Sequence, residues 1–173
     1  MHSNLDPEYE SVEADGDRAS YTHSTAGFRV DVPSRFNTSV PQLSGPIQGR
    51  FFLVPRSDEW FPAMLYAAAV EYAPPGGDAF EEEFERLSDE ELGALAGEFL
   101  SGDQVLQTVR KVSHGGVPGI ELVAEDPPQG LVQVTRIFFG DGHMVMVSGL
   151  LPASRFDEQE PLVREYLDSL SWL

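Results

Sequence analysis

Apolar and polar residues alternate along several short segments of the chain, which is the pattern of strands with one buried face. Gly27–Pro33 is the clearest of them, because Phe28, Val30 and Val32 fall on one side and a proline closes the segment. Six further segments predict strands, either by alternation or by a short apolar run between turn residues. They are 49–54, 62–72, 105–112, 119–125, 131–139 and 143–151.

The segment 62–72 is the most ambiguous of these strands. Its alanine run, Ala67–Val70, favours a helix by propensity alone. However, Tyr66, Val70 and Tyr72, together with the prolines that follow, favour a strand buried on both faces. The run is also far too short to cross a membrane.

Residues 79–100 carry the clearest helical pattern. Ser88 precedes Glu91 by three residues, which is the spacing of a capping box. Asp78 and Glu81 repeat that spacing at the start of the segment. Apolar residues recur every three or four positions after each cap, so the pattern predicts two consecutive helices, or one helix bent near Ser88.

A second helical pattern lies near the C-terminus. Asp157 precedes Glu160 by three residues, and Phe156 is placed as a hydrophobic staple. Apolar residues then recur at helical spacing through Leu170. Pro161 is expected in the first turn, where the missing N–H is tolerated.

The order of elements is therefore a strand-rich region, a helical region, a four-stranded meander and a terminal helix. Segregated blocks of this kind predict an α+β fold, in which helices cover a central antiparallel sheet of about six to seven strands. The 173 residues suit one domain, which we expect to comprise residues 21–173 as a single sheet with its helices.

Residues 1–20 differ from the rest of the chain because they hold many carboxylates and few apolar side chains. This composition predicts a flexible acidic N-terminal tail. The tail also lacks the positive and apolar segments of a signal peptide. The protein is then either cytoplasmic or an exported protein whose signal is not part of this sequence, and of the two we favour export. The carboxylates are Asp6, Glu8, Glu10, Glu13, Asp15 and Asp17.

The overall charge limits the partners that the protein can have. There are 29 Asp and Glu against 11 Lys and Arg, which gives a formal net charge of −18. Such a chain is unsuited to nucleic acid, whose phosphates require Lys and Arg, and to anionic lipid surfaces. The chain has no cysteine, which excludes disulfides, thiolate metal sites and a cysteine nucleophile.

Several phrases of the sequence resemble PsbP-like domains. Residues 27–33, Gly-Phe-Arg-Val-Asp-Val-Pro, resemble the opening strand of that superfamily, and residues 114–122 resemble its strand entry with the form G-x-P-G-x-E. Residues 136–149 resemble its central hairpin, and Ser169-Leu170 matches the end of its terminal helix. The resemblance runs from Tyr21 to the end of the chain.

The resemblance implies a central antiparallel sheet between helical layers, an α/β/α sandwich. The superfamily includes the photosystem subunit PsbP, a Ran-binding import factor of yeast, the bacterial envelope protein DcrB and chaperones of type VI secretion effectors. These are accessory, binding or assembly proteins rather than enzymes. The resemblance therefore implies a function of that kind, but it transfers no ligand-binding residue to this chain.

A metal site is one chemical possibility. His114 and His143 are both expected at turns or strand ends, where they could approach one another across the sheet and bind Zn²⁺ together with Asp141. The histidines lack the spacing of metal ligands, so turn histidines without a metal are the simpler interpretation. We expect no cofactor.

Catalytic patterns are weak. The carboxylates of 81–85 and 89–91 lie opposite the apolar stripe of the expected helices, where a solvated face explains them. Ser148 lacks the G-x-S-x-G context of a nucleophile, and the glycines of 115–119 lack the lysine of a phosphate-binding loop. The sequence therefore predicts a protein that is not an enzyme.

Two surfaces are candidates for binding a protein partner. Trp60 and Phe61 lie in an expected loop, where they either pack on the core or form an exposed anchor. Met144 and Met146 alternate with Val145 and Val147, so one of these pairs faces away from a helical layer unless helices cover both faces. An open methionine-lined face could hold an apolar peptide.

The sequence therefore favours a non-catalytic module that binds another protein. The alternatives are an intracellular chaperone for hydrophobic segments of secreted effectors, which would be a dimer with an apolar cleft, and a metal-binding accessory protein. The sequence does not decide between a monomer and a homodimer.

Overall fold

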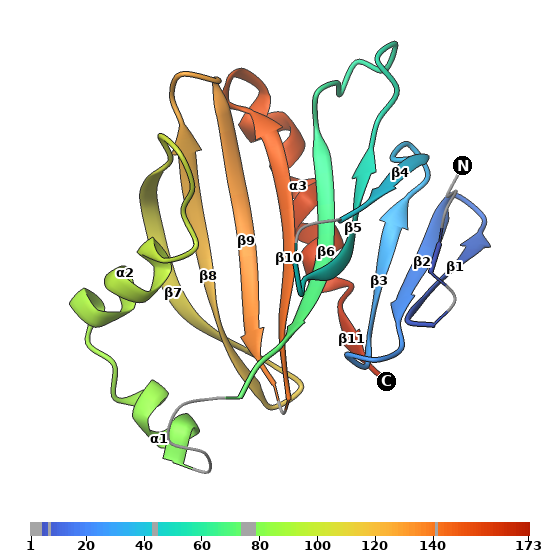
Figure 1. The fold of residues 1–173 in the computed structure, drawn as a ribbon. Coiled ribbons are helices and arrows are strands. Elements are labelled where there is room, and N and C mark those ends of the chain that lie inside the picture. Colours follow the sequence, from blue (N-terminus) through green and yellow to red (C-terminus); the bar gives the residue numbers. More distant parts are fainter. Residues whose placement is uncertain (1–4, 7, 43–44, 74–78, 141) are drawn as a thin grey trace.

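A computed structural model describes residues 5–6, 8–42, 45–73, 79–140 and 142–173. It contains two antiparallel sheets (Figure 1). The larger has seven strands in the order β4-β5-β6-β10-β9-β8-β7, and the smaller has four in the order β1-β2-β3-β11. The strands are β1 Glu10–Asp15, β2 Arg18–His23, β3 Phe28–Pro33, β4 Thr38–Pro41, β5 Gln48–Leu53, β6 Met64–Glu71, β7 Val105–His114, β8 Val117–Asp126, β9 Leu131–Phe139, β10 His143–Pro152 and β11 Ser171–Trp172.

The large sheet confirms the predicted α+β class. Strands β7 to β10 follow one another as an antiparallel meander, as the turn residues between them predicted. β6, the ambiguous alanine-rich segment, is a strand and pairs with β10 across the sheet. Ala67 and Ala69 on one side and Ala68 on the other are all buried, in agreement with a strand covered on both faces.

The expectation of a single sheet was wrong for the first predicted strand. β3 lies in the small sheet between β2 and β11, and β4, which the pattern did not predict, occupies an edge of the large sheet. Phe28, Val30 and Val32 are buried as the alternation required. Alternation identifies the buried face of a strand, but it carries no information about which other strand lies beside it.

The expected flexible tail was also wrong for its described part. β1 and β2 form a hairpin around Gly16, whose φ of 62° suits glycine at a tight turn. The carboxylate of Glu10 is fully buried, where it accepts a 2.8 Å hydrogen bond from Arg50 Nη2 and a 2.9 Å bond from the Tyr21 hydroxyl. The other two acidic side chains of β1, Glu13 and Asp15, are exposed, so an acidic strand is compatible with a folded sheet.

The helical region is divided as predicted. α1 spans Phe80–Glu85 and α2 spans Asp89–Gly97, with a complete capping box between Ser88 and Glu91. The other proposed cap in this region involves Asp78, which lies outside the described residues.

The terminal helix is confirmed, but its predicted cap is wrong. α3 spans Phe156–Asp168 and follows directly from η2, a 3₁₀ turn at Ala153–Arg155. Asp157 therefore lies inside the first turn instead of capping it, and no side chain caps the helix. Pro161 is the sixth residue of the helix and so lies in the second turn, not in the first turn as predicted.

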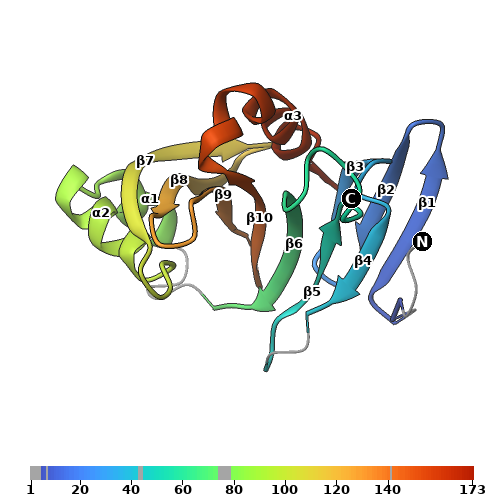
Figure 2. The same ribbon diagram turned by 90° about the horizontal axis from the view of Figure 1, so that it is seen from above.

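Helices lie on both sides of the large sheet (Figure 2). On one side, α3 and the small sheet enclose the main hydrophobic core, which contains Val145 and Val147 of β10. On the other side, α1 and α2 enclose a smaller core with Ile120 and Ile137. None of the helices in the described ranges is long and apolar enough to pass through a bilayer.

Candidate binding groove

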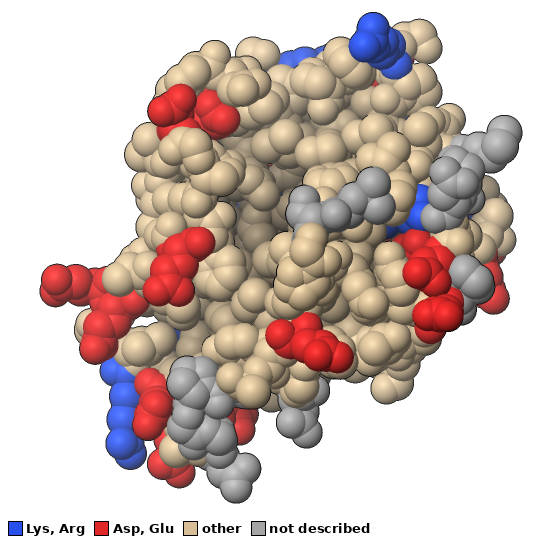
Figure 3. All heavy atoms as spheres, viewed as in Figure 1, with Lys and Arg blue, Asp and Glu red and all other residues tan. Residues whose placement is uncertain are grey.

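Part of the large sheet has no helix over it. α1 and α2 cover the side of the sheet near β7, and the rest of the same face forms a groove of about 610 Å³. Figure 3 shows this hollow near the middle of the face, with mostly uncharged atoms in it and acidic groups at its margin. Its volume lies in the usual range for ligand pockets.

The strand register explains why residues distant in sequence meet in the groove. Side chains directly opposite one another on neighbouring strands share a face of the sheet. The central row crosses β5, β6, β10, β9 and β8 and consists of Phe51, Tyr66, Ser148, Thr135 and Leu122. The rows on either side add Met64, Leu150 and Gln133 towards one end, and Met146 and Ile137 towards the other.

Two loops form the walls of the groove. On the β5 side, Gln42 and Ile47 line it, and the backbone N–H of Gln42 donates to the carbonyl of Gly49 at 2.9 Å. On the α2 side, Phe99 and Ser101 line it where the chain runs from α2 to β7. The groove therefore runs between these walls, along the direction of β9 and β10.

One end of the central row is aromatic. The rings of Phe51 and Tyr66 stack with their centroids 4.6 Å apart. Burial raises the pKa of Tyr66 to about 12, so its hydroxyl is neutral at physiological pH. This end offers an apolar surface with a hydrogen-bonding tip.

A track of uncharged polar side chains crosses the middle of the floor. Gln104 Nε2 donates to Gln133 Oε1 at 2.7 Å, and Gln133 Nε2 donates to Ser148 Oγ at 3.4 Å. Thr135 stands opposite Ser148 and is 7% exposed. Its hydroxyl has no hydrogen-bond partner among the described residues, and an unpaired buried hydroxyl is energetically costly.

The charge at the groove is negative. Among the described side chains that line the groove, Asp126 at the end of β8 is the only charged one. Its carboxylate accepts a 3.3 Å hydrogen bond from the backbone N–H of Gln129 and forms no salt bridge with a described residue.

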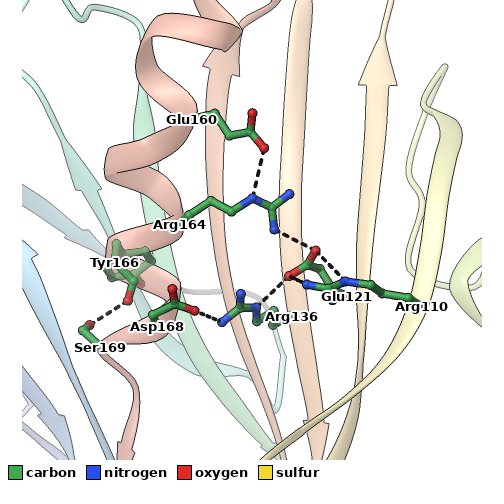
Figure 4. A network of polar contacts seen from close by, with 8 residues as sticks. All are labelled: Arg110, Glu121, Arg136, Glu160, Arg164, Tyr166, Asp168 and Ser169. Atoms are coloured by element: carbon green, nitrogen blue, oxygen red, sulfur yellow. Dashed lines mark hydrogen bonds and ion pairs between the residues drawn. The ribbon is translucent and has the colours of Figure 1, made fainter.

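The opposite face of the same sheet is closed by a network of ion pairs (Figure 4). Glu121 of β8 accepts hydrogen bonds from Arg110, Arg136 and Arg164, the last of these on α3. Burial of the carboxyl disfavours its charge, but the three guanidinium groups outweigh that effect and hold the pKa of Glu121 at about 2. The network thereby ties α3 to β7, β8 and β9.

The predicted partner-binding residues separate into two places. Met146 lines the groove, and Met144 packs beside it against the core under α1 and α2. Trp60 packs partly on the main core with the Arg35 guanidinium 4.4 Å above its ring. Phe61 is 48% exposed, so the Trp60-Phe61 loop remains a separate candidate surface.

The proposed histidine pair does not come together. His114 and His143 lie at the same end of the sheet, but β8 and β9 separate their strands. Three inter-strand spacings amount to about 14 Å, which is too far for both to bind one ion. His114 packs against Phe138 and Trp172 instead. Asp141 lies outside the described residues, and no cluster of three or more metal-ligating groups occurs within the described ranges.

Sequence reasoning missed the polar track of the floor. Gln133 and Thr135 alternate with Val132 and Val134 along β9, and such polar positions usually face solvent. The available signal was that Ser148 on the adjacent predicted strand also occupies a polar position. The pairing of those two strands could be predicted from the short turn between them.

Two solved structures match the fold of this chain over most of its length. One is cyanobacterial PsbP from Synechocystis sp. PCC 6803, with a TM-score of 0.56, 12% sequence identity, and coverage of 99% of this chain and 96% of that one. Another is a protein of unknown function from Pseudomonas aeruginosa described as a putative regulator, with a TM-score of 0.48, 13% identity, and coverage of 94% and 96%. No protein-family model matches the chain. A search of curated proteins gives no significant match. The chain therefore has the PsbP-like fold that its sequence phrases predicted.

Proposed function

We propose that this PsbP-like chain is a non-catalytic accessory module, and that it binds a segment of another protein in the groove on the open face of its large sheet. The observation that carries the proposal is an apolar floor that no helix covers, crossed by the amide side chains of Gln104 and Gln133. A bound segment would cover the apolar rows and form hydrogen bonds with these amides.

The chemistry of the lining supports binding rather than catalysis. The described side chains that line the groove are apolar groups, amides and hydroxyls, with Asp126 at one end. General acid–base catalysis needs a titratable group held at the reacting atom with a suitable pKa. Amides and neutral hydroxyls instead provide orientation and specificity, which are the needs of a binding site.

The test combines site-specific crosslinking with a binding measurement. A photoreactive amino acid at position 146 should crosslink in native cells to one partner protein, which is then purified. We expect Met146→Glu to weaken binding of that partner at least tenfold in calorimetry, because the new charge enters an apolar floor.

Phe61→Glu is the matched control, since it adds the same charge at the other candidate surface. Melting curves of both variants separate lost binding from lost folding. If Phe61→Glu abolishes binding and Met146→Glu leaves it intact, the partner uses the Trp60-Phe61 loop and the groove proposal is wrong.

The chaperone alternative has one observation in its favour. Met64 and Met146 both line the groove, and flexible methionine side chains suit surfaces that accept varied apolar segments. That function predicts a homodimer, whereas the groove of one chain suffices for our main proposal. Light scattering of the purified protein over a range of concentrations distinguishes them.

A further inference from the structure

We infer that His23 is an acid-sensitive latch, which holds the β1–β2 hairpin on the rest of the fold while its ring is neutral and favours release of the hairpin when the ring is protonated. The latch lies on the N-terminal side of the molecule and is independent of the groove. Three features carry it: the complete burial of the ring, a hydrogen bond that only the neutral ring can accept, and the place of the hairpin at the edge of the small sheet.

The ring of His23 is enclosed by other rings. His23 ends β2, and its side chain is fully buried. It stacks on Phe28 of β3 with the ring centroids 5.3 Å apart, and Tyr9, which directly precedes β1, packs against it at 5.0 Å. Burial among aromatic groups disfavours a charged imidazole, because it removes the water that would solvate the charge. The ring therefore joins β3 to the start of the hairpin best when it is neutral.

A hydrogen bond determines which ring nitrogen must be free of a proton. The backbone N–H of Ala26 donates to His23 Nδ1 at 3.2 Å, so this nitrogen has to offer a lone pair. Both nitrogens of a protonated imidazole carry hydrogen, so protonation would set two donors against one another and break the bond. Ala26 lies in the turn between β2 and β3. The bond therefore closes this turn only while His23 is neutral.

The other ring nitrogen does not compensate for that loss. Nε2 of His23 is buried and forms no hydrogen bond with a described residue. Burial lowers the pKa of His23 below its ordinary value of 6.5, and the opposing effects of the Gln48 backbone and the Glu10 carboxylate are smaller. The folded hairpin thus takes up a proton less readily than the open one.

The titratable groups around the ring do not offer a new partner to its proton. Glu10 on β1 already binds Arg50 of β5 at 2.8 Å. His143 on β10 acts against a charge on His23, since two positive imidazoles repel one another. The Tyr9 hydroxyl stays neutral, because burial raises its pKa. Protonation of His23 in the closed hairpin is therefore unfavourable from every side.

The β1–β2 hairpin can separate while the large sheet stays folded. β1 lies at the edge of the small sheet, where it pairs with β2, and Figure 1 shows the hairpin on the outside of the molecule. Local opening of an edge unit requires less free energy than global unfolding, because it exposes less buried surface. A proton that binds the open hairpin more tightly than the closed one shifts this local equilibrium towards release.

The pH range of the latch separates it from the buried carboxylates. Because the pKa of His23 is lowered on folding, stability is complete above 6.5 and is lost as the pH falls below that value. The pKa values of Glu10 and Glu121 are also lowered, because hydrogen bonds to their carboxylates outweigh burial, so both stay ionised in this range. If the closed hairpin takes up no proton, its opening constant should rise about eightfold between pH 7.0 and pH 5.5.

The test compares the full chain at these two pH values. Hydrogen exchange of the ¹⁵N-labelled protein, corrected for the intrinsic effect of pH on exchange, gives the opening constant of each amide. We expect the amides of β1 and β2 to open about eightfold more often at pH 5.5 than at pH 7.0, and those of β8 and β9 to change less than about twofold. Titration of the His23 ring by its carbon chemical shifts should give a midpoint below 6.5.

Two variants remove the titration and keep different parts of the latch. His23→Asn supplies a side-chain oxygen as the acceptor for Ala26, and His23→Phe keeps the ring stack with Phe28. Neither new side chain titrates in this range, so the difference between the two pH values should disappear in both, whatever their absolute stability. His114→Asn is the matched control, because it removes a histidine from β7 in the large sheet and should keep the eightfold change.

Three results would overturn the latch. A midpoint at or above 6.5 for the His23 ring would mean that the folded protein accepts the proton. An equal rise in the opening constants of β1–β2 and β8–β9 would mean that the proton acts on global unfolding and not on the hairpin. An unchanged opening constant in the wild type, or an undiminished pH effect in both His23 variants, would assign any acid sensitivity to other groups.

Discussion

The two faces of the seven-stranded sheet differ in how they are covered. On the α3 face, Glu121 is paired with three arginines, and the sheet is closed by a helix and a network. On the groove face, Thr135 has no partner among the described residues, and Asp126 forms no salt bridge with them. Buried polar atoms without a partner among the described residues occur on the α3 side as well, in the amide of Gln159, so pairing alone does not separate the faces. The α3 face is closed by its own helix, whereas the groove face leaves an apolar floor open, and this supports the proposal that the groove binds a partner.

Breaking the network on the α3 face should have the largest effect on stability. Glu121→Ala leaves three guanidinium groups together without their carboxylate, and we expect a loss of about 3 kcal/mol in the free energy of unfolding. Urea denaturation measures it. Glu160→Gln is the control, because the side chains of the Glu160–Arg164 pair are 31% and 30% exposed and the loss of this pair should cost less than about 1 kcal/mol. Equal losses in the two variants would contradict a central role for Glu121.

Protonation of Glu121 at low pH should weaken the same network in the wild-type protein. The pKa of Glu121 is lowered from 4.5 to about 2 on folding, so its contribution is complete above pH 4.5 and is lost as the pH falls towards 2. We expect it to account for about 2–3 kcal/mol of the acid destabilisation of the wild type. Glu121→Gln should therefore show a shallower decline between pH 5 and pH 2. An unchanged slope in that variant would assign acid sensitivity to other carboxylates.

On the groove face, we expect the smallest effect on stability, and it should be a gain in the free energy of unfolding. Thr135→Val replaces an unpaired hydroxyl with a methyl group of similar size, and we expect the protein to become more stable by about 1 kcal/mol. Urea denaturation measures the change, and Thr135→Ser is the control that keeps the hydroxyl. A loss of stability in Thr135→Val would mean that the hydroxyl is satisfied in the folded protein, for example by water.

Local sequence patterns predicted most helices and strands, but they did not predict which strands pair with one another. The alternation of Phe28, Val30 and Val32 identified a buried strand, and the spacing of Ser88 and Glu91 located the break between two helices. Both signals depend on residues within a few positions of one another. The same alternation did not place β3 in the small sheet, because strand pairing depends on segments far apart in the chain.

The acidic N-terminus shows a related limit. Composition predicted a solvated tail, and most carboxylates of β1 are indeed exposed. Glu10 is the exception, since it is buried against Arg50, forty residues away in sequence. Composition cannot distinguish one paired carboxylate from its unpaired neighbours, so the folded hairpin was missed.

The candidate site was predicted only in part. Met146 was selected because it alternates with buried valines, and it lines the groove. Phe51, Tyr66 and Thr135 were not selected, because each is an ordinary strand residue in its own segment. They become a site only through the register of β5, β6, β10 and β9.

The sequence by itself determined which apolar side chains of the predicted strands would be buried, where the helices would lie and that the chain would carry a net negative charge. These properties follow from the spacing of apolar residues along the chain and from its composition. Only the tertiary structure decided which strands became neighbours, which face α3 covered and which face stayed open. That choice depends on the combined packing of distant segments, since each strand could pair with several others until the whole core is assembled.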